Sequence, residues 1–233
     1  VAYGHVGNAA ARFALQRLGH EAWCVPTIIL SSHPGHPGFA GEATPRPLLE
    51  ILLGALDTQG RLRQCDAVLS GYLGSPAQAD SVAAAVRRTR AGNPQALYCL
   101  DTVFGDDGRI YARPGVVEAM AATLLPLADI VTPNAFELAT LTGLPVGDPD
   151  EAIAAARALS RPVVVVTSVP DGDRLATLVL EGQLAWLAST PRIDGAPRGP
   201  GDLFAALFIG QTLLGHAAPE AMALAARATY HVL

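Results

Sequence analysis

Strand-like and helix-like segments alternate along almost the whole chain, and this alternation is the strongest constraint on its fold. Short apolar runs interleaved with amphipathic helices build a mostly parallel sheet covered on both faces. We therefore expect an α/β fold, a three-layer α/β/α sandwich around such a sheet. The expected strands are residues 21–30, 66–74, 96–101, 129–134 and 162–168, with a hairpin over 174–189. The expected helices are 7–19, 45–56, 75–92, the first half of 114–128, 134–143, 148–160, a run after residue 202, and 219–233.

Finer signals predict how some of these elements begin and which residues they bury. Phe13, Leu15 and Leu18 are expected to face the core from their helix, because they follow its apolar spacing. Ser75 and Pro76 suit the cap and the first position of the helix that follows them.

Composition limits where such a protein can work. Half of the 233 residues are hydrophobic and no linker-like stretch divides them, so we expect one domain over residues 1–233. The net charge of −5, with no basic run, argues against a nucleic-acid or anionic-membrane surface. No apolar run reaches the roughly 20 residues of a membrane span, and a cytoplasmic location is expected. Cys24, Cys65 and Cys99 are widely spaced, as expected of small buried hydrophobes in a reducing compartment.

The segment Gly199-Pro200-Gly201-Asp202 joins a turn to one carboxylate. Its glycines let backbone N–H groups approach a ligand, and the helix predicted behind it directs its N-terminus to the same place. A phosphoryl group could be held there by amides, with Asp202 accepting a proton from a hydroxyl. Aspartate is also a preferred N-cap residue. From the sequence of the segment alone, Asp202 is either a cap or a catalytic base.

Asn134 and Glu137 follow another predicted strand and share one face of the next helix, because they are three positions apart. An amide and a carboxylate can hold Mg²⁺ through its bound waters. The same spacing is typical of a capping box, in which the two residues satisfy each other's backbone N–H groups. Both interpretations stay open from the spacing alone.

Further polar residues lie at the ends of predicted strands. Asp101, Thr132 and Thr167 are at carboxyl ends, where open α/β sheets bind their ligands. The Tyr72 ring could stack on a planar ligand. A strand-terminating acid is the alternative for Asp101, and a half-buried packing residue is the alternative for Tyr72.

Together and in this order, these signals resemble the ribokinase-like superfamily, and within it the pyridoxal kinases. The resemblance covers nearly the whole chain and implies a ribokinase-like fold. It also implies ATP-dependent phosphorylation of the 5′-hydroxyl of pyridoxal, pyridoxine or pyridoxamine, giving pyridoxal 5′-phosphate in B6 salvage. The matching motifs are AYGHVGNAAARFALQRLGHEAW (2–23), CDAVLSGYLGS (65–75), LPLADIVTPNAFELATLTG (125–143) and GPGDLFAALFIG (199–210).

The resemblance also implies a role for each matching residue. Asp202 would take the proton from the 5′-hydroxyl, and Gly199, Pro200 and Gly201 would form the anion hole. Mg²⁺ would accompany ATP, the family pattern allows a monovalent cation as well, and the protein would be a homodimer. The remaining implied contacts are Asp101, Thr132, Glu137 and Thr167 for ATP, Asp101, Asn134 and Glu137 for the metal, and Tyr72, His33 and Asp202 for the substrate.

Several positions depart from the family pattern. Pro200 stands where the family has Thr, Ala or Val, and because proline has no N–H the anion hole is expected to lose a donor. Thr102 replaces the proline that follows the acidic residue, and Pro34 and Gly35 replace a polar pair in the substrate loop. We also expect segments of the family's pattern before Val1, in the ATP flap and at the C-terminus to be absent from this sequence.

Other functions stay open from the sequence alone. A kinase of the same fold could act on hydroxymethylpyrimidine, a sugar or another small alcohol. A B6- or nucleotide-binding protein without activity would follow if Pro200 disables the anion hole, and a purely structural α/β domain is a weaker alternative. His5, His33 and His36 lie in loops rich in Gly or Pro, where a solvated histidine is more common than a catalytic one.

Overall fold

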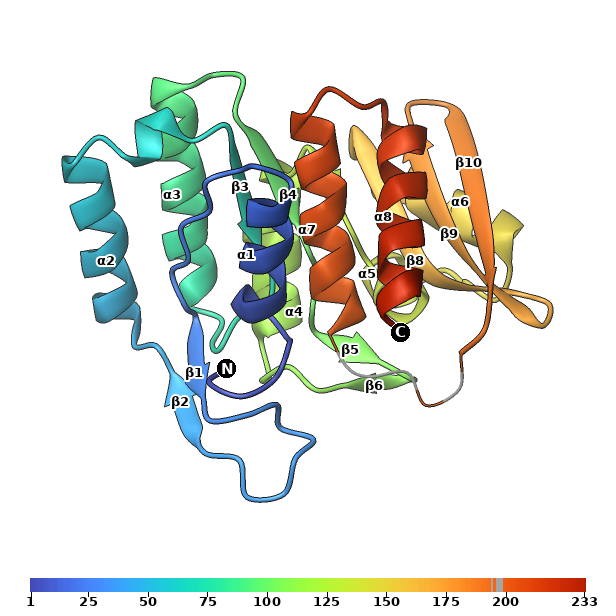
Figure 1. Cartoon of the computed structure of the whole chain (residues 1–233), viewed down its shortest axis with the longest axis horizontal. Coiled ribbons are helices and arrows are strands. Elements are labelled where there is room, and N and C mark those ends of the chain that lie inside the picture. Colours follow the sequence, from blue (N-terminus) through green and yellow to red (C-terminus); the bar gives the residue numbers. More distant parts are fainter. Residues whose placement is uncertain (194, 196–198) are drawn as a thin grey trace.

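A six-stranded mixed sheet lies at the centre of the computed structural model, which describes residues 1–193, 195 and 199–233. Its strand order is β10-β9-β8-β7-β4-β3 (Figure 1). The first four strands along the chain are parallel and the last two form an antiparallel hairpin at one side. The mostly parallel α/β architecture is confirmed. The strands are β3 (Ala67–Ser70), β4 (Leu97–Leu100), β7 (Ile130–Val131), β8 (Val163–Asp171), β9 (Arg174–Glu181) and β10 (Leu184–Pro191).

Helices cover both faces of the sheet, as the alternation predicts (Figure 1). One face is covered by α1 (Asn8–Arg17), α7 (Pro200–Leu213) and α8 (Ala218–Val232). The other is covered by α3 (Gln78–Gly92), α4 (Val116–Ala119), α5 (Ala135–Thr142) and α6 (Pro149–Ala158), and α2 (Arg46–Thr58) packs against α3. Short turns of other helix types are Leu62–Gln64 (3₁₀), Met120–Leu124 (π) and Leu125–Leu127 (3₁₀). The last two extend the α4 segment beyond the half that the sequence predicts.

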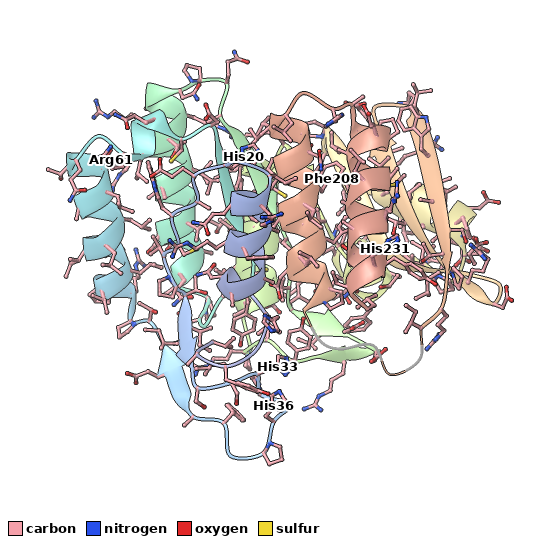
Figure 2. The ribbon with its side chains drawn as sticks, in the orientation of Figure 1. His20, His33, His36, Arg61, Phe208 and His231 are labelled. Carbon is pink, nitrogen blue, oxygen red and sulfur yellow. The ribbon has the colours of Figure 1, made fainter. Side chains whose placement is uncertain are left out.

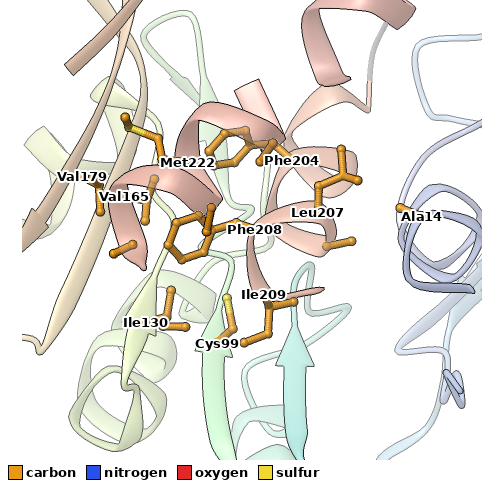
Figure 3. Packing of buried hydrophobic residues seen from close by; sticks show 14 residues of the cluster. Ala14, Cys99, Ile130, Val165, Val179, Phe204, Leu207, Phe208, Ile209 and Met222 are labelled. Carbon is orange, nitrogen blue, oxygen red and sulfur yellow. The ribbon is translucent and has the colours of Figure 1, made fainter. Parts of the chain in front are cut away.

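Helix α7 is deeply enclosed beside the sheet, with seven of its 14 residues buried. Its Phe204, Phe208 and Ile209 are buried and pack among residues of the strands beneath (Figure 3). Burying each such side chain contributes roughly 1.5–3 kcal/mol. Because the core holds this helix along its length, the residues at its N-terminus have a fixed place relative to the strand ends.

Helix α1 lies directly against α7. Gly210 permits this approach, since a Cβ atom there would lie 2.6 Å from Leu18 Cδ1. His20 Nε2 lies 2.9 Å from the Gly210 carbonyl oxygen. The close packing buries the small residues Ala10 and Ala14 of α1, whereas the predicted core residue Phe13 is 64% exposed. The prediction for Phe13 was therefore wrong, because a larger side chain cannot enter so narrow an interface.

Two small antiparallel pairs, β1 (Ile28–Leu30) with β2 (Gly41–Ala43) and β5 (Gly105–Asp106) with β6 (Arg109–Ile110), lie outside the central sheet. Figure 1 shows both pairs at the lower edge of the molecule, near the N-terminal ends of α1 and α7. The strand predicted over 21–30 is thus mostly wrong: only its last three residues are extended in a ladder, and their partner is β2. Pro26 precedes them and has no N–H for a ladder.

A buried glutamine attaches the β1–β2 pair to the rest of the fold. Gln78 Nε2 donates to the carbonyl oxygens of Thr27 and Thr44, both at 2.8 Å, and its Oε1 accepts from the Gly74 N–H at 2.8 Å. Helix α3 begins at this residue, with Ala77 as N-cap. The predicted cap at Ser75 is therefore wrong, because the hydrogen bonds of Gln78 decide where the helix starts.

The three cysteines differ in exposure. Cys24 is exposed, Cys65 is half-buried and Cys99 is fully buried, so the expectation of three buried thiols is wrong for Cys24. None of the helices in the described ranges combines the length and apolar character required of a bilayer-spanning segment.

Gly74→Ala is expected to lower the free energy of unfolding by about 1–3 kcal/mol, because overpacking displaces backbone. The new Cβ would lie 2.6 Å from Ala43 Cβ and 2.9 Å from the Thr27 carbonyl oxygen. Gly71→Ala is the matched control, since its Cβ would meet only Val103 and Asp101 atoms at 3.6 Å and 3.9 Å. Urea unfolding followed by circular dichroism measures both variants. Equal stability of the two would contradict the packing argument.

Candidate active site

Asp101 and Thr132 meet at the ends of neighbouring parallel strands. The backbone N–H of Asp101 donates to Ser70 O at 2.8 Å and that of Thr132 donates to Leu100 O at 3.0 Å, which continues the ladder past β4 and β7. Thr132 Oγ1 then donates to Asp101 Oδ1 at 2.7 Å, and both residues are buried. The structure therefore brings together two residues predicted separately from their positions at strand ends.

Asp202 is the third residue of α7, not its N-cap. The N-cap is Gly199, in a left-handed conformation, and no side chain caps this helix end. Asp202 Oδ2 instead accepts a hydrogen bond from the Gly7 N–H at 2.8 Å. The simple capping interpretation of Asp202 is thus wrong, and its carboxylate is directed toward the start of α1.

Glu137 accepts four hydrogen bonds, two on each carboxylate oxygen. Phe104 N and Gly105 N donate to Oε1 at 2.8 Å and 3.2 Å. Thr102 Oγ1 and Asn134 N donate to Oε2 at 2.8 Å and 3.1 Å. Glu137 N in turn donates to Asn134 Oδ1 at 2.8 Å, which completes a capping box. The capping-box interpretation is confirmed, and Thr102 supplies a donor that a proline at its position would lack.

Three carboxylates interact in this region, of which Asp101 and Glu137 are buried and Asp202 is half-buried. Burial raises the pKa of the Asp101 carboxyl well above its ordinary value, and the charges of Asp202 and Glu137 raise it further. Burial also raises the pKa of Asp202, opposed by the Gly7 hydrogen bond, and the pKa of Glu137, opposed by its four donors. Perturbed acids gathered in this way are typical of functional sites.

The side chains of Glu137, Asn134 and Asp101 suit a hydrated magnesium ion better than a metal coordinated by protein groups alone. Each Glu137 oxygen already accepts two hydrogen bonds, and the Asn134 amide is bonded at Oδ1 and, through Nδ2, to Gly105 O at 2.8 Å. Asp101 Oδ2 has no hydrogen-bond donor in the described part of the chain. No group of three or more His, Cys, Asp or Glu side chains within the described residues could by itself hold a metal. An ion here would retain waters or phosphate ligands, as Mg²⁺ usually does.

Thr167 lies inside β8, not at a strand end as predicted, because β8 continues to pair with β9 as far as Asp171. The register breaks between Val166 and Val169, and Ser168 adopts a φ of 57°. Thr167 N donates to Pro133 O at 2.9 Å, and the residue forms a bridge with Asn134. Bulges often occur beside active sites, where they redirect a side chain.

The predicted anion hole lies at the first turn of α7. Pro200 is the first helical residue, where the N–H that proline lacks would have no helical partner. The loss of one donor from an anion hole stays a prediction, and the N–H groups of Gly201 and Asp202 are the backbone donors left in this turn. A Cβ atom on Gly199 would lie 2.4 Å from His5 O, so the loop packs tightly on the N-terminal segment. Residues 196–198 of the same loop lie outside the described part of the chain.

Tyr72 and His33, which are predicted to bind the substrate together with Asp202, lie on loops. Tyr72 is half-buried against the cluster under α3 and α4, as its alternative interpretation predicts, and its carbonyl accepts from Thr27 Oγ1. Figure 2 shows His33 and His36 in the loop between β1 and β2. His33 Nδ1 accepts from the Gly35 N–H at 2.9 Å, and His36 makes an edge contact with Tyr3.

Sequence reasoning missed two residues beside the carboxylates. Tyr111 is 44% exposed, and its backbone N–H donates to Phe104 O at 3.0 Å, in the loop that Glu137 holds. Partial burial and the charges of Glu137, Asp101, Asp106 and Asp202 raise the pKa of its hydroxyl. Its signal was its position three residues after the predicted turn of residues 106–108. The second missed residue is Gly7, which acts through its backbone N–H and so has no side-chain signature.

Comparisons with known proteins show what the whole chain is similar to. The family model described as phosphomethylpyrimidine kinase matches residues 51–233. Pyridoxal kinase PdxY of Deinococcus radiodurans is 44% identical over 247 residues, covering 100% of this chain and 83% of that protein. The corresponding protein of Rubrobacter xylanophilus is 43% identical over 242 residues, with coverage of 100% and 83%. The structure of Leishmania donovani pyridoxal kinase in complex with ADP and pyridoxamine superposes with a TM-score of 0.91 at 30% identity, covering 98% of this chain and 84% of that one.

Asp101→Asn is expected to raise the free energy of unfolding at pH 7. The folded-state pKa of Asp101 lies above the ordinary 3.8, so the folded protein binds this proton more tightly than the unfolded chain. The stability of the wild type must then fall as the pH rises from about 4 through the folded pKa. The Asn side chain does not titrate, so the variant does not lose stability in this way. Its free energy of unfolding should therefore exceed that of the wild type at neutral pH, and the difference should vanish near pH 3.

Urea unfolding across this pH range measures the difference. Asp173→Asn, at an exposed position beside the turn between β8 and β9, is the control and should match the wild type throughout. An Asp101→Asn protein less stable than the wild type at pH 7 would contradict the predicted direction of the change in the free energy of unfolding.

Proposed function

The chain belongs to the pyridoxal kinase family, and we propose that it transfers the γ-phosphoryl group of ATP to the 5′-hydroxyl of pyridoxal, pyridoxine or pyridoxamine. With pyridoxal the product is pyridoxal 5′-phosphate, a reaction of B6 salvage. The observation that carries the proposal is the 2.7 Å hydrogen bond between Thr132 and Asp101 at the ends of neighbouring strands. Asp202 in the first turn of α7 and Glu137 in the first turn of α5 are close enough for their charges to raise the pKa of Asp101. Phosphoryl transfer depends mainly on positioning and charge stabilisation, and this arrangement supplies groups for both.

Asp202 is the general base of the proposal. Burial brings its pKa closer to the working pH, which favours proton transfer. Gly7 occupies Oδ2, so Oδ1 accepts the hydroxyl proton as the substrate oxygen attacks the γ-phosphorus. The bond from that phosphorus to the bridging oxygen breaks, ADP leaves, and Asp202 later releases its proton to water.

The start of α7 holds the transferring phosphoryl group in this proposal. The N–H groups of Gly201 and Asp202 and the helix dipole stabilise its charge, and Gly199 and Pro200 shape the turn. Mg²⁺, when bound, neutralises phosphate charge, and Asp101 would hold it through Oδ2 while Thr132 fixes the carboxylate.

The remaining predicted contacts belong to the same proposal. Glu137 and Asn134 keep the loop after β4 in place and act on the ion through its waters. Thr167 contacts ATP, and Tyr72 and His33 contact the vitamer. A monovalent cation remains an addition that the family pattern allows.

We further propose that residues 1–233 form one kinase domain that works as a homodimer in the cytoplasm. Exposed apolar side chains support self-association, since Phe13 and Ile51 are 64% and 66% exposed. Sedimentation equilibrium should give twice the 24.1 kDa mass of the chain. A monomer at all micromolar concentrations would contradict the dimer.

A second candidate function is the phosphorylation of hydroxymethylpyrimidine. The family description matched by residues 51–233 favours it. A panel of the three B6 vitamers, hydroxymethylpyrimidine and ribose with MgATP separates the candidates by kcat/KM. Highest kcat/KM for a B6 vitamer supports the main proposal, and highest kcat/KM for the pyrimidine replaces it.

Asp202→Asn is expected to lower kcat by about two to four orders of magnitude, the usual contribution of a general base, with little change in vitamer binding. Product formation and calorimetric binding measure the two effects. Asp173→Asn is the control for removal of a carboxylate elsewhere and should keep wild-type kcat. Retained activity of Asp202→Asn would refute the assignment of the base. A wild type that neither turns over nor binds any vitamer or ATP would refute the function.

A further inference from the structure

Asp202 lies where the N-termini of two helices meet. It belongs to the first turn of α7, and its Oδ2 accepts the N–H of Gly7, the N-cap of α1, at 2.8 Å. The Gly7 carbonyl accepts from Ala10 N and Ala11 N at 3.1 Å and 3.0 Å, so the same residue starts α1. Each helix end presents positive partial charge to a carboxylate. The two ends together favour the ionised form that burial disfavours.

The backbone of Gly7 is shaped for this contact. Its φ of 57° and ψ of −136° lie in a region that residues with a Cβ atom rarely adopt. The neighbouring segment is fixed as well, because Gly199 leaves no room for a Cβ atom between itself and His5 O or Val6 Cγ1, at 2.4 Å and 2.9 Å. The N-terminal turn therefore contacts the start of α7 twice, at the helix cap and at the carboxylate.

The hydrogen bond from Gly7 to Asp202 is not needed to attach α1 to α7. At the opposite end of the two helices, Gly210 admits Leu18 at close range and its carbonyl oxygen lies 2.9 Å from His20 Nε2. Packing and a hydrogen bond therefore join the helices far from Asp202. The Gly7 contact instead acts on a carboxylate oxygen, and on one oxygen only.

We propose that the turn of residues 4–7 is a positioning element of the reaction, whose Gly7 N–H holds Asp202 Oδ2 so that Oδ1 faces the substrate hydroxyl. The inference rests on the proposed function, because it assigns the partner of the proposed base. Gly7 touches neither substrate nor phosphate in this scheme. Its effect passes through the orientation and the ionisation of Asp202.

Gly7→Ala tests the proposal, because a Cβ atom there forces the turn out of its present φ and ψ. We expect kcat to fall by about tenfold or more with KM for ATP unchanged. The acidic limb of the kcat–pH profile should move to higher pH, since the lost hydrogen bond favoured ionised Asp202. Other groups facing this carboxylate are Asp101, Tyr111 and the amino group of Val1, and the substitution leaves them in place.

Gly19→Ala is the matched control, at the other end of α1. Gly19 also has a positive φ, 92°, and open space around it, so the substitution also strains a left-handed backbone position but does not touch Asp202. Its kcat and its acidic limb should stay within about twofold and a few tenths of a pH unit of the wild type. A control that loses as much kcat as Gly7→Ala would overturn the proposal.

Carboxyl NMR of Asp202 without substrate keeps this test separate from the proposed function. Titration of Asp202 should move to higher pH in Gly7→Ala whether or not the protein phosphorylates a vitamer. Replacing the residue-7 amide by an ester through semisynthesis removes only the N–H, and serves if the alanine variant does not fold. An unchanged Asp202 titration in the folded alanine or ester protein would overturn the inference.

Discussion

The four hydrogen bonds accepted by Glu137 are the interaction on which the geometry of the site depends. They connect the loop that follows β4 with the first turn of α5, two segments more than 30 residues apart in sequence. Without an acceptor at this place, the buried Phe104 and Gly105 N–H groups would have to find other partners, at a cost of about 1–3 kcal/mol each. The loop that leads away from Asp101 therefore has its path set by a neighbouring helix.

Function and stability make opposite demands on the carboxylates. Burial disfavours the charged form of Asp101, Glu137 and Asp202 alike, and the chain opposes this with backbone donors and helix termini in place of basic side chains. Glu137 receives the most donors and serves the fold. Asp101 retains an oxygen without a donor in the described residues, and Asp202 retains one oxygen beyond the reach of Gly7. Asp101 and Asp202, which have unused acceptor capacity, are the groups proposed to hold the metal directly and to accept the hydroxyl proton, whereas Glu137 is proposed to act on the ion only through its waters.

Much of the fold was predictable because strands and helices differ in apolar period. The end of α5 at Gly143 and the turn after Glu181 follow from local signals that tertiary contacts did not override. The residues before Ile28 were mispredicted because the strand β2 has three residues and pairs only with Ile28–Leu30. Contact of Asp101 with a neighbouring strand end was foreseeable from parallel topology. The hydrogen bond from Gly7 to Asp202 spans 195 positions and uses a backbone N–H, so no pattern of residue types predicts it.

The three cysteines differ in exposure, so their rates of reaction with a thiol reagent can report on the structure. Cys24 lies on the surface, Cys65 is half-buried, and Cys99 is enclosed under α7 beside Phe208 and Ile209. Burial also raises the pKa of the Cys65 and Cys99 thiols, more strongly at Cys99. A thiol reagent would therefore reach Cys99 only when α7 separates from the sheet. The modification rate of this one sulfur would report the opening of the layer that carries Asp202, with no engineered label.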